Sequence, residues 1–166
     1  GESVELSEDK MLPIAIQFAV IATSLIAGVF LSFSDFIMRS LTAAQPAAGV
    51  EAMQEINRKV YRSVFLTLFF AMTVGSVLLV GVGAVIGGSG GPWLIAGGAV
   101  YLTGVFAVTV FGNVPMNKQL DALPLSNAET LKYWRHYAIR WTRWNHVRTI
   151  SSALSAVMFL IAIQHL

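Results

Sequence analysis

The side chains best suited to chemistry lie on one helical stripe near the C-terminus. Trp134, Tyr137, Trp141, Asn145 and Arg148 recur at steps of three and four residues, which places them on one face of a helix. Tryptophan and tyrosine at a membrane boundary usually form an interfacial belt. A belt does not, however, require an amide and a guanidinium on the same stripe. We therefore favour a pocket for a flat, partly polar aromatic ligand.

His146 stands beside this stripe, about 100° around the helix, and is the best candidate for a proton acceptor in the chain. The other histidines, His136 and His165, are not expected to cluster with it, and the chain has no cysteine. We predict no cofactor and no metal site, with a haem or a single metal held by His146 as the alternative. The chain contains no phosphate-binding loop, dinucleotide glycine fingerprint or serine-nucleophile elbow.

A carboxylate follows the first long apolar run. Asp35 near hydrocarbon costs several kcal/mol unless it faces protein or water. Arg39 comes one helical turn later and could pair with it. Two interpretations are open: a structural ion pair at a helix end, or a role in binding substrate and handling its proton.

Two groups of amide side chains complete the candidate site. Gln54, Asn57 and Tyr61 share one helix face, which is either a solvated helix start or part of a binding site. Asn113 and Asn117 bracket a proline at the end of a later apolar run. They could cap exposed backbone groups, contact a ligand, or do both.

Four membrane-spanning helices must position these residues. Of the 166 residues, 55% are hydrophobic and 12% are charged, whereas a soluble domain usually carries about twice that charge. We predict an all-α, four-transmembrane-helix bundle forming one domain over residues 11–166. Residues 1–10 are interpreted as a polar N-terminal extension or an expression remnant. The apolar runs that predict the spans cover residues 12–33, 64–86, 93–111 and 149–163, the last extended by the turns before it.

Prolines suggest where the chain leaves the helices. Residues 42–49 are expected to form a small-residue loop around Pro46. Residues 113–125 contain Pro115 and Pro124, so an irregular connection is expected there.

Other local signals concern the last helix and the helix contacts. Ser126 and Glu129 match a capping box that opens a helix over residues 128–164. Gly83 and Gly87 are four residues apart in an apolar helix and favour close packing against a neighbouring helix.

Basic residues gather on one side of the predicted bundle. Ten of the eleven Lys and Arg residues flank the first and third connections, and only Lys10 lies on the other side. The positive-inside rule then places both termini outside and the basic connections in the cytoplasm, in a bacterial inner membrane. The net charge of +2 does not suggest a nucleic-acid partner.

Four segments resemble the anthrone oxygenase-like family, small four-helix membrane proteins formerly grouped as a domain of unknown function. The segments are residues 33–39, 53–57, 113–117 and 134–149, and the last is the most specific. The resemblance covers nearly the whole chain from about residue 12. It places these residues on recurring family positions: Asp35, Asn57, Asn113, Asn117, Trp134, Tyr137, Asn145, His146 and Arg148.

The resemblance implies a membrane oxidoreductase, because some members are associated with oxidising an anthrone to an anthraquinone without a conventional cofactor. We expect a lipophilic phenolic or polycyclic substrate and O₂. His146 or Asp35 would remove a proton, and Arg148 with Asn113 or Asn145 would stabilise the enolate. The expected substrate-binding residues are Arg39, Gln54, Asn57, Asn113, Asn117, Trp134, Tyr137, Trp141 and Asn145.

The rival hypothesis is a non-catalytic membrane module. The same stripe could hold a quinone or lipid, or the chain could be a small subunit of a membrane complex. The expected partners are the lipid bilayer and a lipophilic aromatic or quinone-like molecule, and a homo-oligomer stays open. A transporter is disfavoured because the polar residues gather toward one membrane face rather than along a route.

Overall fold

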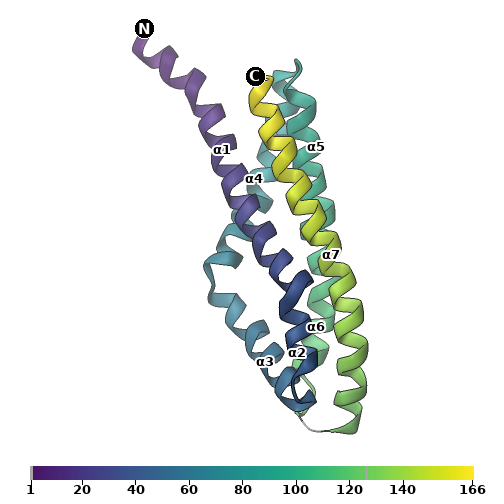
Figure 1. Cartoon of the computed structure of the whole chain (residues 1–166). Helices are drawn as coiled ribbons and strands as arrows, with labels where there is room; N and C mark the ends of the chain where they lie inside the picture. The colour runs from purple at the N-terminus through teal and green to yellow at the C-terminus, as the bar shows by residue number, and fades with distance from the viewer. Residues whose placement is uncertain (1, 126) are drawn as a thin grey trace.

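The computed structural model describes residues 2–125 and 127–166. Within these residues the regular structure is entirely helical (Figure 1). Four helical segments are long and apolar enough to cross a membrane, which confirms the predicted bundle: the chain is an all-α integral membrane protein. These segments are Lys10–Ala43, Val64–Ile86, Gly91–Asp121 and Ala128–Gln164.

In the described part of the chain seven α-helices make up the bundle, and short turns of other helix types join some of them end to end. The α-helices are α1 (Glu2–Ser32), α2 (Met38–Ala43), α3 (Pro46–Lys59), α4 (Val64–Ile86), α5 (Gly91–Tyr101), α6 (Val114–Asp121) and α7 (Ala128–Gln164). The joining turns are π-helical at Phe33–Ile37, Leu102–Ala107 and Thr109–Asn113, and 3-10 at Val60–Arg62.

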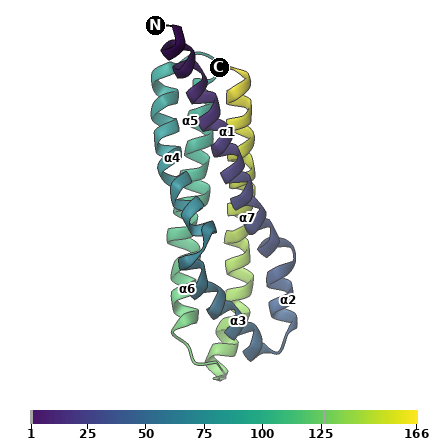
Figure 2. The same cartoon turned by 90° about the vertical axis from the view of Figure 1, so that its left-hand side faces the viewer.

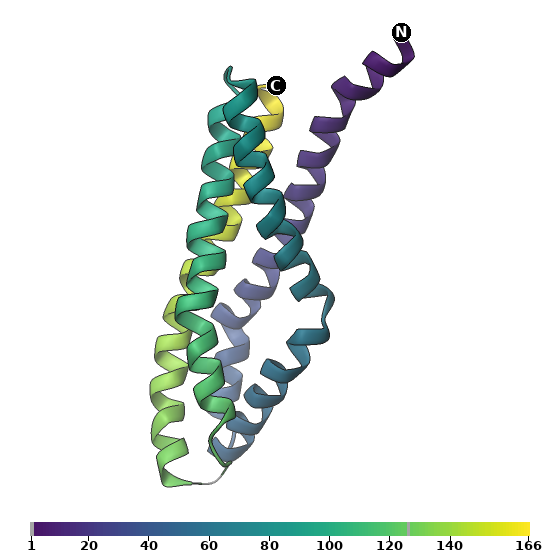
Figure 3. The ribbon, with the colours of Figure 1, turned by 180° about the vertical axis from the view of Figure 1, so that it is seen from behind.

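The helices are arranged around α7, the longest element. It packs against α1 and α5, while α4 packs against α5 and α1. Both termini lie at one end of the bundle and α2, α3 and α6 lie at the other (Figures 1 and 2). The first turns of α1 lean away from the other helices (Figure 3). Because α7 is about 55 Å long and a hydrocarbon core is about 30 Å thick, its first turns extend beyond the membrane beside α3 and α6.

Two predicted irregular connections are wrong over most of their length, and prolines explain both errors; only residues 122–125 of the second are irregular as predicted. The first connection is only two residues long, because Pro46 occupies the first turn of α3 instead of ending a helix. Residues 114–121 form α6, with Pro115 again in the first turn. A proline in the first helical turn is tolerated, because the backbone N–H that it lacks has no partner within the helix.

The last helix begins at Ala128, as the sequence predicts, and the predicted capping box includes Ser126. Ser126 lies outside the described residues. Asn127 is the N-cap of α7, and its side-chain oxygen accepts a hydrogen bond of 2.7 Å from the Glu129 backbone N–H. This bond satisfies one of the free donors at the start of the helix.

Close packing at Gly83 is confirmed, but its neighbour is Gly91 of α5. A Cβ atom at Gly83 would lie 2.6 Å from the Gly91 carbonyl oxygen. Gly87 instead ends α4, with a φ of 59°. That positive φ lets the chain turn back at once into α5.

Replacing Gly83 with Val is expected to force α4 and α5 apart at this contact. The clash is with backbone, which cannot move aside as a flexible side chain can, so a loss of about 1–3 kcal/mol is expected. The thermal unfolding midpoint in detergent measures this loss. Gly81→Val is the matched control, because a Cβ at Gly81 meets no atom within 4 Å. Equal midpoints for the two variants would contradict the close contact.

Candidate functional site

A cavity of about 580 Å³ lies among α1, α3, α4, α6 and α7, beside the 3-10 turn Val60–Arg62. Most of its wall is aromatic and aliphatic, which suits a lipophilic ligand. Its polar lining is mainly amide, hydroxyl and guanidinium. The polar and charged residues that line it are Glu55, Asn57, Lys59, Tyr61, Ser63, Thr109, Asn117, Asn145 and Arg148.

Arg148 is the most unusual group in this lining, because it is a cation that is only 6% exposed. Its Nη2 donates to Asn145 Oδ1 at 2.8 Å, and its Nη1 donates to Thr109 Oγ1 at 3.2 Å. Its Cζ lies 4.4 Å from the centre of the Phe30 ring and 5.2 Å from that of the Trp141 ring.

No carboxylate balances this charge within the described part of the chain, where the ion pairs involve other residues. The Arg148 Nε is also buried there without a hydrogen-bond partner. A buried cation without a counter-ion is costly, and within a membrane protein it usually marks a functional site. The site is therefore electrostatically suited to an anionic ligand.

Asn145 fixes the position of the guanidinium. Its Nδ2 donates to the Phe30 carbonyl oxygen at 2.7 Å and to Ser34 Oγ at 2.8 Å. Both amide protons are therefore used on the α1 side, and Oδ1 is left to accept from Arg148. The amide cannot turn over without breaking all three bonds.

Asn117 holds the aromatic stripe in place. Its Oδ1 accepts hydrogen bonds of 2.8 Å from the Tyr137 hydroxyl and from Trp141 Nε1. The Tyr137 ring stacks on both Trp134 and Trp141, with ring centres 5.6 Å and 6.2 Å apart. All three rings are buried, so this part of the stripe lies in the interior rather than in a surface belt. Of the three, Trp141 lines the cavity, and Trp134 and Tyr137 pack behind it.

Two further amides near the cavity have unused hydrogen-bonding atoms. Asn57 lines the cavity, and its Nδ2 is buried without a partner in the described residues. Asn113 donates to the Trp141 carbonyl oxygen at 3.2 Å, and its Oδ1 is likewise buried and unpaired. Since buried amide atoms are normally paired, Asn57 offers a donor to a bound ligand.

Several predicted site residues lie outside the cavity lining. Asp35 and Arg39 pair with each other at 3.3 Å, with side chains 66% and 76% exposed. Gln54 donates to the carbonyl oxygens of Leu120 and Leu123, at 2.9 and 3.0 Å, and so ties α3 to the end of α6.

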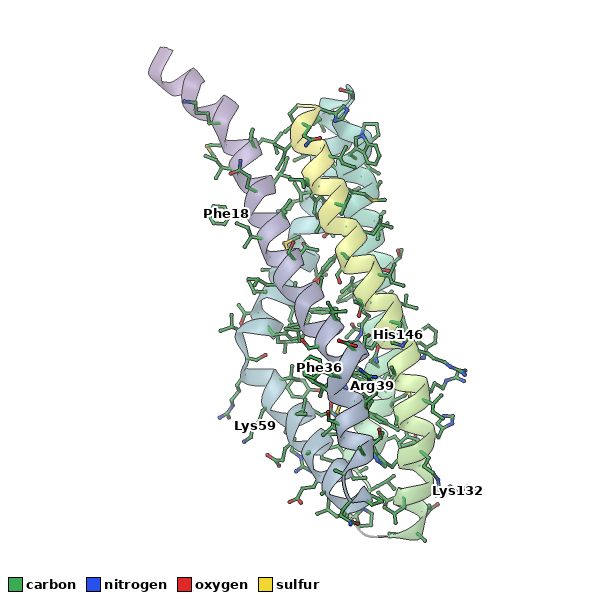
Figure 4. The ribbon with its side chains drawn as sticks, viewed as in Figure 1. Phe18, Phe36, Arg39, Lys59, Lys132 and His146 are labelled. Carbon is green, nitrogen blue, oxygen red and sulfur yellow. The ribbon has the colours of Figure 1, made fainter. Side chains whose placement is uncertain are left out.

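His146 also lies outside the lining, although it is next to Asn145. It is exposed on α7, where its Nδ1 is 2.9 Å from Ser34 Oγ (Figure 4). No group of three or more histidine, aspartate or glutamate side chains comes together as a metal site in residues 2–125 and 127–166.

Thr109, Phe30 and Ser34 contribute contacts that the sequence did not predict. Thr109 sits in an apolar run and belongs to the π-helical turn Thr109–Asn113, and Ser34 belongs to the turn Phe33–Ile37. A π turn changes which side chains face the interior and leaves no mark on a 3.6-residue pattern. Single polar residues within an apolar run were the one available signal.

Charged residues gather where α3 ends at the cavity. Arg58 pairs with Asp121 at 2.8 Å and with Glu55 at 3.1 Å. Hydrogen bonds from Arg58 and Lys59 keep the pKa of Glu55 below its ordinary value. Lys59 points away from the bundle (Figure 4). Glu55 is thus an ionised group held by its neighbours and a weak proton acceptor.

The fold and the cavity define a class of protein: a four-helix integral membrane protein whose mainly apolar cavity is lined by a buried guanidinium. A family model described as anthrone oxygenase matches residues 58–158, and the chain belongs to that family. The matched segment includes Asn113, Asn117, Asn145 and Arg148. Comparison with curated proteins and comparison with solved structures each gave no match.

Proposed function

We propose that the protein is a membrane oxidoreductase that binds a lipophilic phenolic or polycyclic substrate in the cavity and oxidises it with O₂. The observation that carries this proposal is the buried Arg148 in the lining of a mainly apolar cavity, without a carboxylate partner in the described residues. Aromatic rings of a substrate fit the apolar wall, and an oxygen that becomes negative fits the guanidinium.

Arg148 acts by favouring the ionised form of the substrate. A nearby positive charge lowers the pKa of a bound phenol or enol. The Asn145 and Thr109 contacts hold the guanidinium before the substrate arrives, so little reorganisation is needed as charge develops on the substrate oxygen. The unpaired Asn57 Nδ2 donates to a second substrate oxygen.

The chemistry balances with O₂ as the only oxidant. A methylene carbon (CH₂) that is conjugated to the carbonyl through the aromatic rings loses a proton, and its electron pair is delocalised onto the enolate oxygen. The carbanion carbon bonds to O₂, and the peroxide takes back a proton. Loss of water then leaves a carbonyl at that carbon. Overall, CH₂ and O₂ give C=O and H₂O, with the substrate as the reductant, so no cofactor is required.

The proton is released to water at the open side of the cavity. His146 and Asp35 do not line the cavity, and the one lining carboxylate, Glu55, is held by Arg58 and Lys59. This assignment differs from a histidine-based mechanism. It makes the acidity of the substrate, and not that of a protein base, the determinant of the pH dependence.

Oxygen uptake by the protein in lipid nanodiscs tests the proposal, with 1,8-dihydroxyanthrone as the probe. We expect one O₂ consumed per anthraquinone formed, at a rate above that of empty nanodiscs, which corrects for spontaneous oxidation. A rate equal to that of empty nanodiscs would reject this substrate class.

A non-catalytic role in binding a quinone or lipid is the second candidate. The observation that favours it is that the cavity lining offers no histidine, and its one carboxylate is paired. Solvent extraction of the purified protein distinguishes the two. Stoichiometric quinone or lipid, lost in Arg148→Gln and accompanied by no oxygen uptake, would support binding alone.

We further propose a bacterial inner membrane location with α3, α6 and the start of α7 in the cytoplasm. The chain has no cysteine, so single cysteines at Ser89 and Lys132 report topology without background. In intact cells, a membrane-impermeant maleimide is expected to label Ser89→Cys and to spare Lys132→Cys until the cells are lysed. The reverse pattern would invert the orientation.

A further inference from the structure

The histidine beside the cavity is connected to the guanidinium inside it. His146 Nδ1 lies 2.9 Å from Ser34 Oγ, Ser34 Oγ accepts from Asn145 Nδ2 at 2.8 Å, and Asn145 Oδ1 accepts from Arg148 at 2.8 Å. The contacts join the outside of α7 to the cavity through the π-helical turn Phe33–Ile37. We propose that His146 is a positioning residue, which acts through Ser34 and Asn145 to hold Arg148 in place for an anionic substrate.

Counting protons shows why Ser34 needs a partner. Thr149 donates its only hydroxyl proton to the Asn145 carbonyl oxygen at 2.9 Å. In the contact of 3.1 Å between Ser34 and Thr149, Ser34 must therefore be the donor. Ser34 has one proton for two neighbours, His146 and Thr149, while it accepts from Asn145.

With a proton on Nδ1, His146 donates to Ser34, Ser34 donates to Thr149, and every contact is made. Without that proton, Ser34 donates to His146, and its contact with Thr149 is left without a proton. In either case a lone pair of Ser34 stays directed at Asn145, so the amide keeps its orientation.

The connection does not carry a proton from the cavity to His146. Its middle member is an amide, whose nitrogen is a donor without basic character. Ser34 and His146 are also outside the cavity lining. The chain of bonds is suited to holding a geometry and not to removing a substrate proton.

Two substitutions test whether His146 acts through its Nδ1 atom. An asparagine at 146 places its amide nitrogen near the position of Nδ1, whereas a glutamine extends past it. His146→Asn therefore keeps the bond to Ser34 and His146→Gln loses it. The control is His136→Gln, because His136 is exposed on the same helix and is remote from the connection.

The measurement compares the binding of two probes of similar shape, one charged and one neutral. Anthracene-9-carboxylate is an anion and 9-anthracenemethanol is neutral, and both are titrated against protein in nanodiscs with empty nanodiscs subtracted. We expect His146→Gln and Ser34→Ala to weaken binding of the anion about fivefold, which corresponds to the loss of one neutral hydrogen bond. Binding of the neutral probe should be unchanged. His146→Asn and His136→Gln should match the wild type. The double variant that combines His146→Gln with Ser34→Ala should lose no more affinity for the anion than Ser34→Ala alone, because both substitutions break the same connection.

The inference rests on the proposed anion site, and the results separate the two. If Arg148→Gln binds both probes as the wild type does, the anion site itself is rejected. If Arg148→Gln loses the anion selectively but His146→Gln does not, only the positioning role of His146 is overturned. Equal losses for both probes, or equal losses in His146→Asn and His146→Gln, also overturn it, because they indicate general damage to the fold.

Discussion

Arg148→Gln is expected to lower turnover of 1,8-dihydroxyanthrone by about 10²–10³-fold, the effect of removing a preorganised donor to a developing oxyanion. Glutamine keeps a polar group of similar reach but supplies no charge. Without that charge the enolate is no longer favoured over the neutral substrate, so less enolate is present to react with O₂. Oxygen uptake at saturating substrate, with product followed by absorbance, measures the change.

The fold should survive this substitution. Removing a buried cation that has no carboxylate partner among residues 2–125 and 127–166 relieves a desolvation cost instead of leaving a charge unpaired. Arg143→Gln is the matched control, because Arg143 is exposed on the same helix. Arg148→Lys should be intermediate, because an ammonium cannot reproduce the forked contacts to Thr109 and Asn145. Full turnover in Arg148→Gln would remove Arg148 from the mechanism.

The membrane spans were predictable because each appears in the sequence as a long uncharged apolar run. Lipid requires long uncharged helices, so hydropathy located α4 at its observed bounds and the apolar part of α7. The start of α7 at Ala128 came from the capping signal before it. The aromatic stripe was predictable for a similar reason. A regular α-helix preserves the 3.6-residue period over the turns from Trp134 to Arg148, and the structure buries the five stripe residues.

What escaped prediction depends on local departures from that period. Asp35 and Ser34 are adjacent, and a sequence pattern gives no reason for one to contact α7 and the other to face away from it. In the π-helical turn Phe33–Ile37, Ser34 bonds to α7 while Asp35 stays exposed with Arg39. Pro46 and Pro115 were misread because the same residue can end a helix or begin one. The difference lies in tertiary contacts such as those of Gln54 with the end of α6.

Asn117→Leu is expected to destabilise the folded protein by about 2–6 kcal/mol, which is a large part of the stability of a small domain. Leucine has nearly the same volume but accepts no hydrogen bond. The Tyr137 hydroxyl and Trp141 Nε1 both donate to Asn117 Oδ1 at 2.8 Å, and both would be left unpaired in the interior. The sum follows from about 1–3 kcal/mol for each unsatisfied group. Unfolding in a denaturing detergent, followed by tryptophan fluorescence, measures it.

Asn117→Asp separates this structural role from the binding role. An aspartate keeps an oxygen for both donors, so most of the stability should remain. It also adds a negative charge to the lining that includes Arg148, which should weaken anthracene-9-carboxylate and spare 9-anthracenemethanol. A stable Asn117→Leu protein would show that Tyr137 and Trp141 find other acceptors. Unchanged anion binding in a folded Asn117→Asp protein would show that Asn117 and the ligand charge do not share one cavity. Asn117 thus both holds the aromatic stripe and lines the cavity, and the two variants measure these contributions separately.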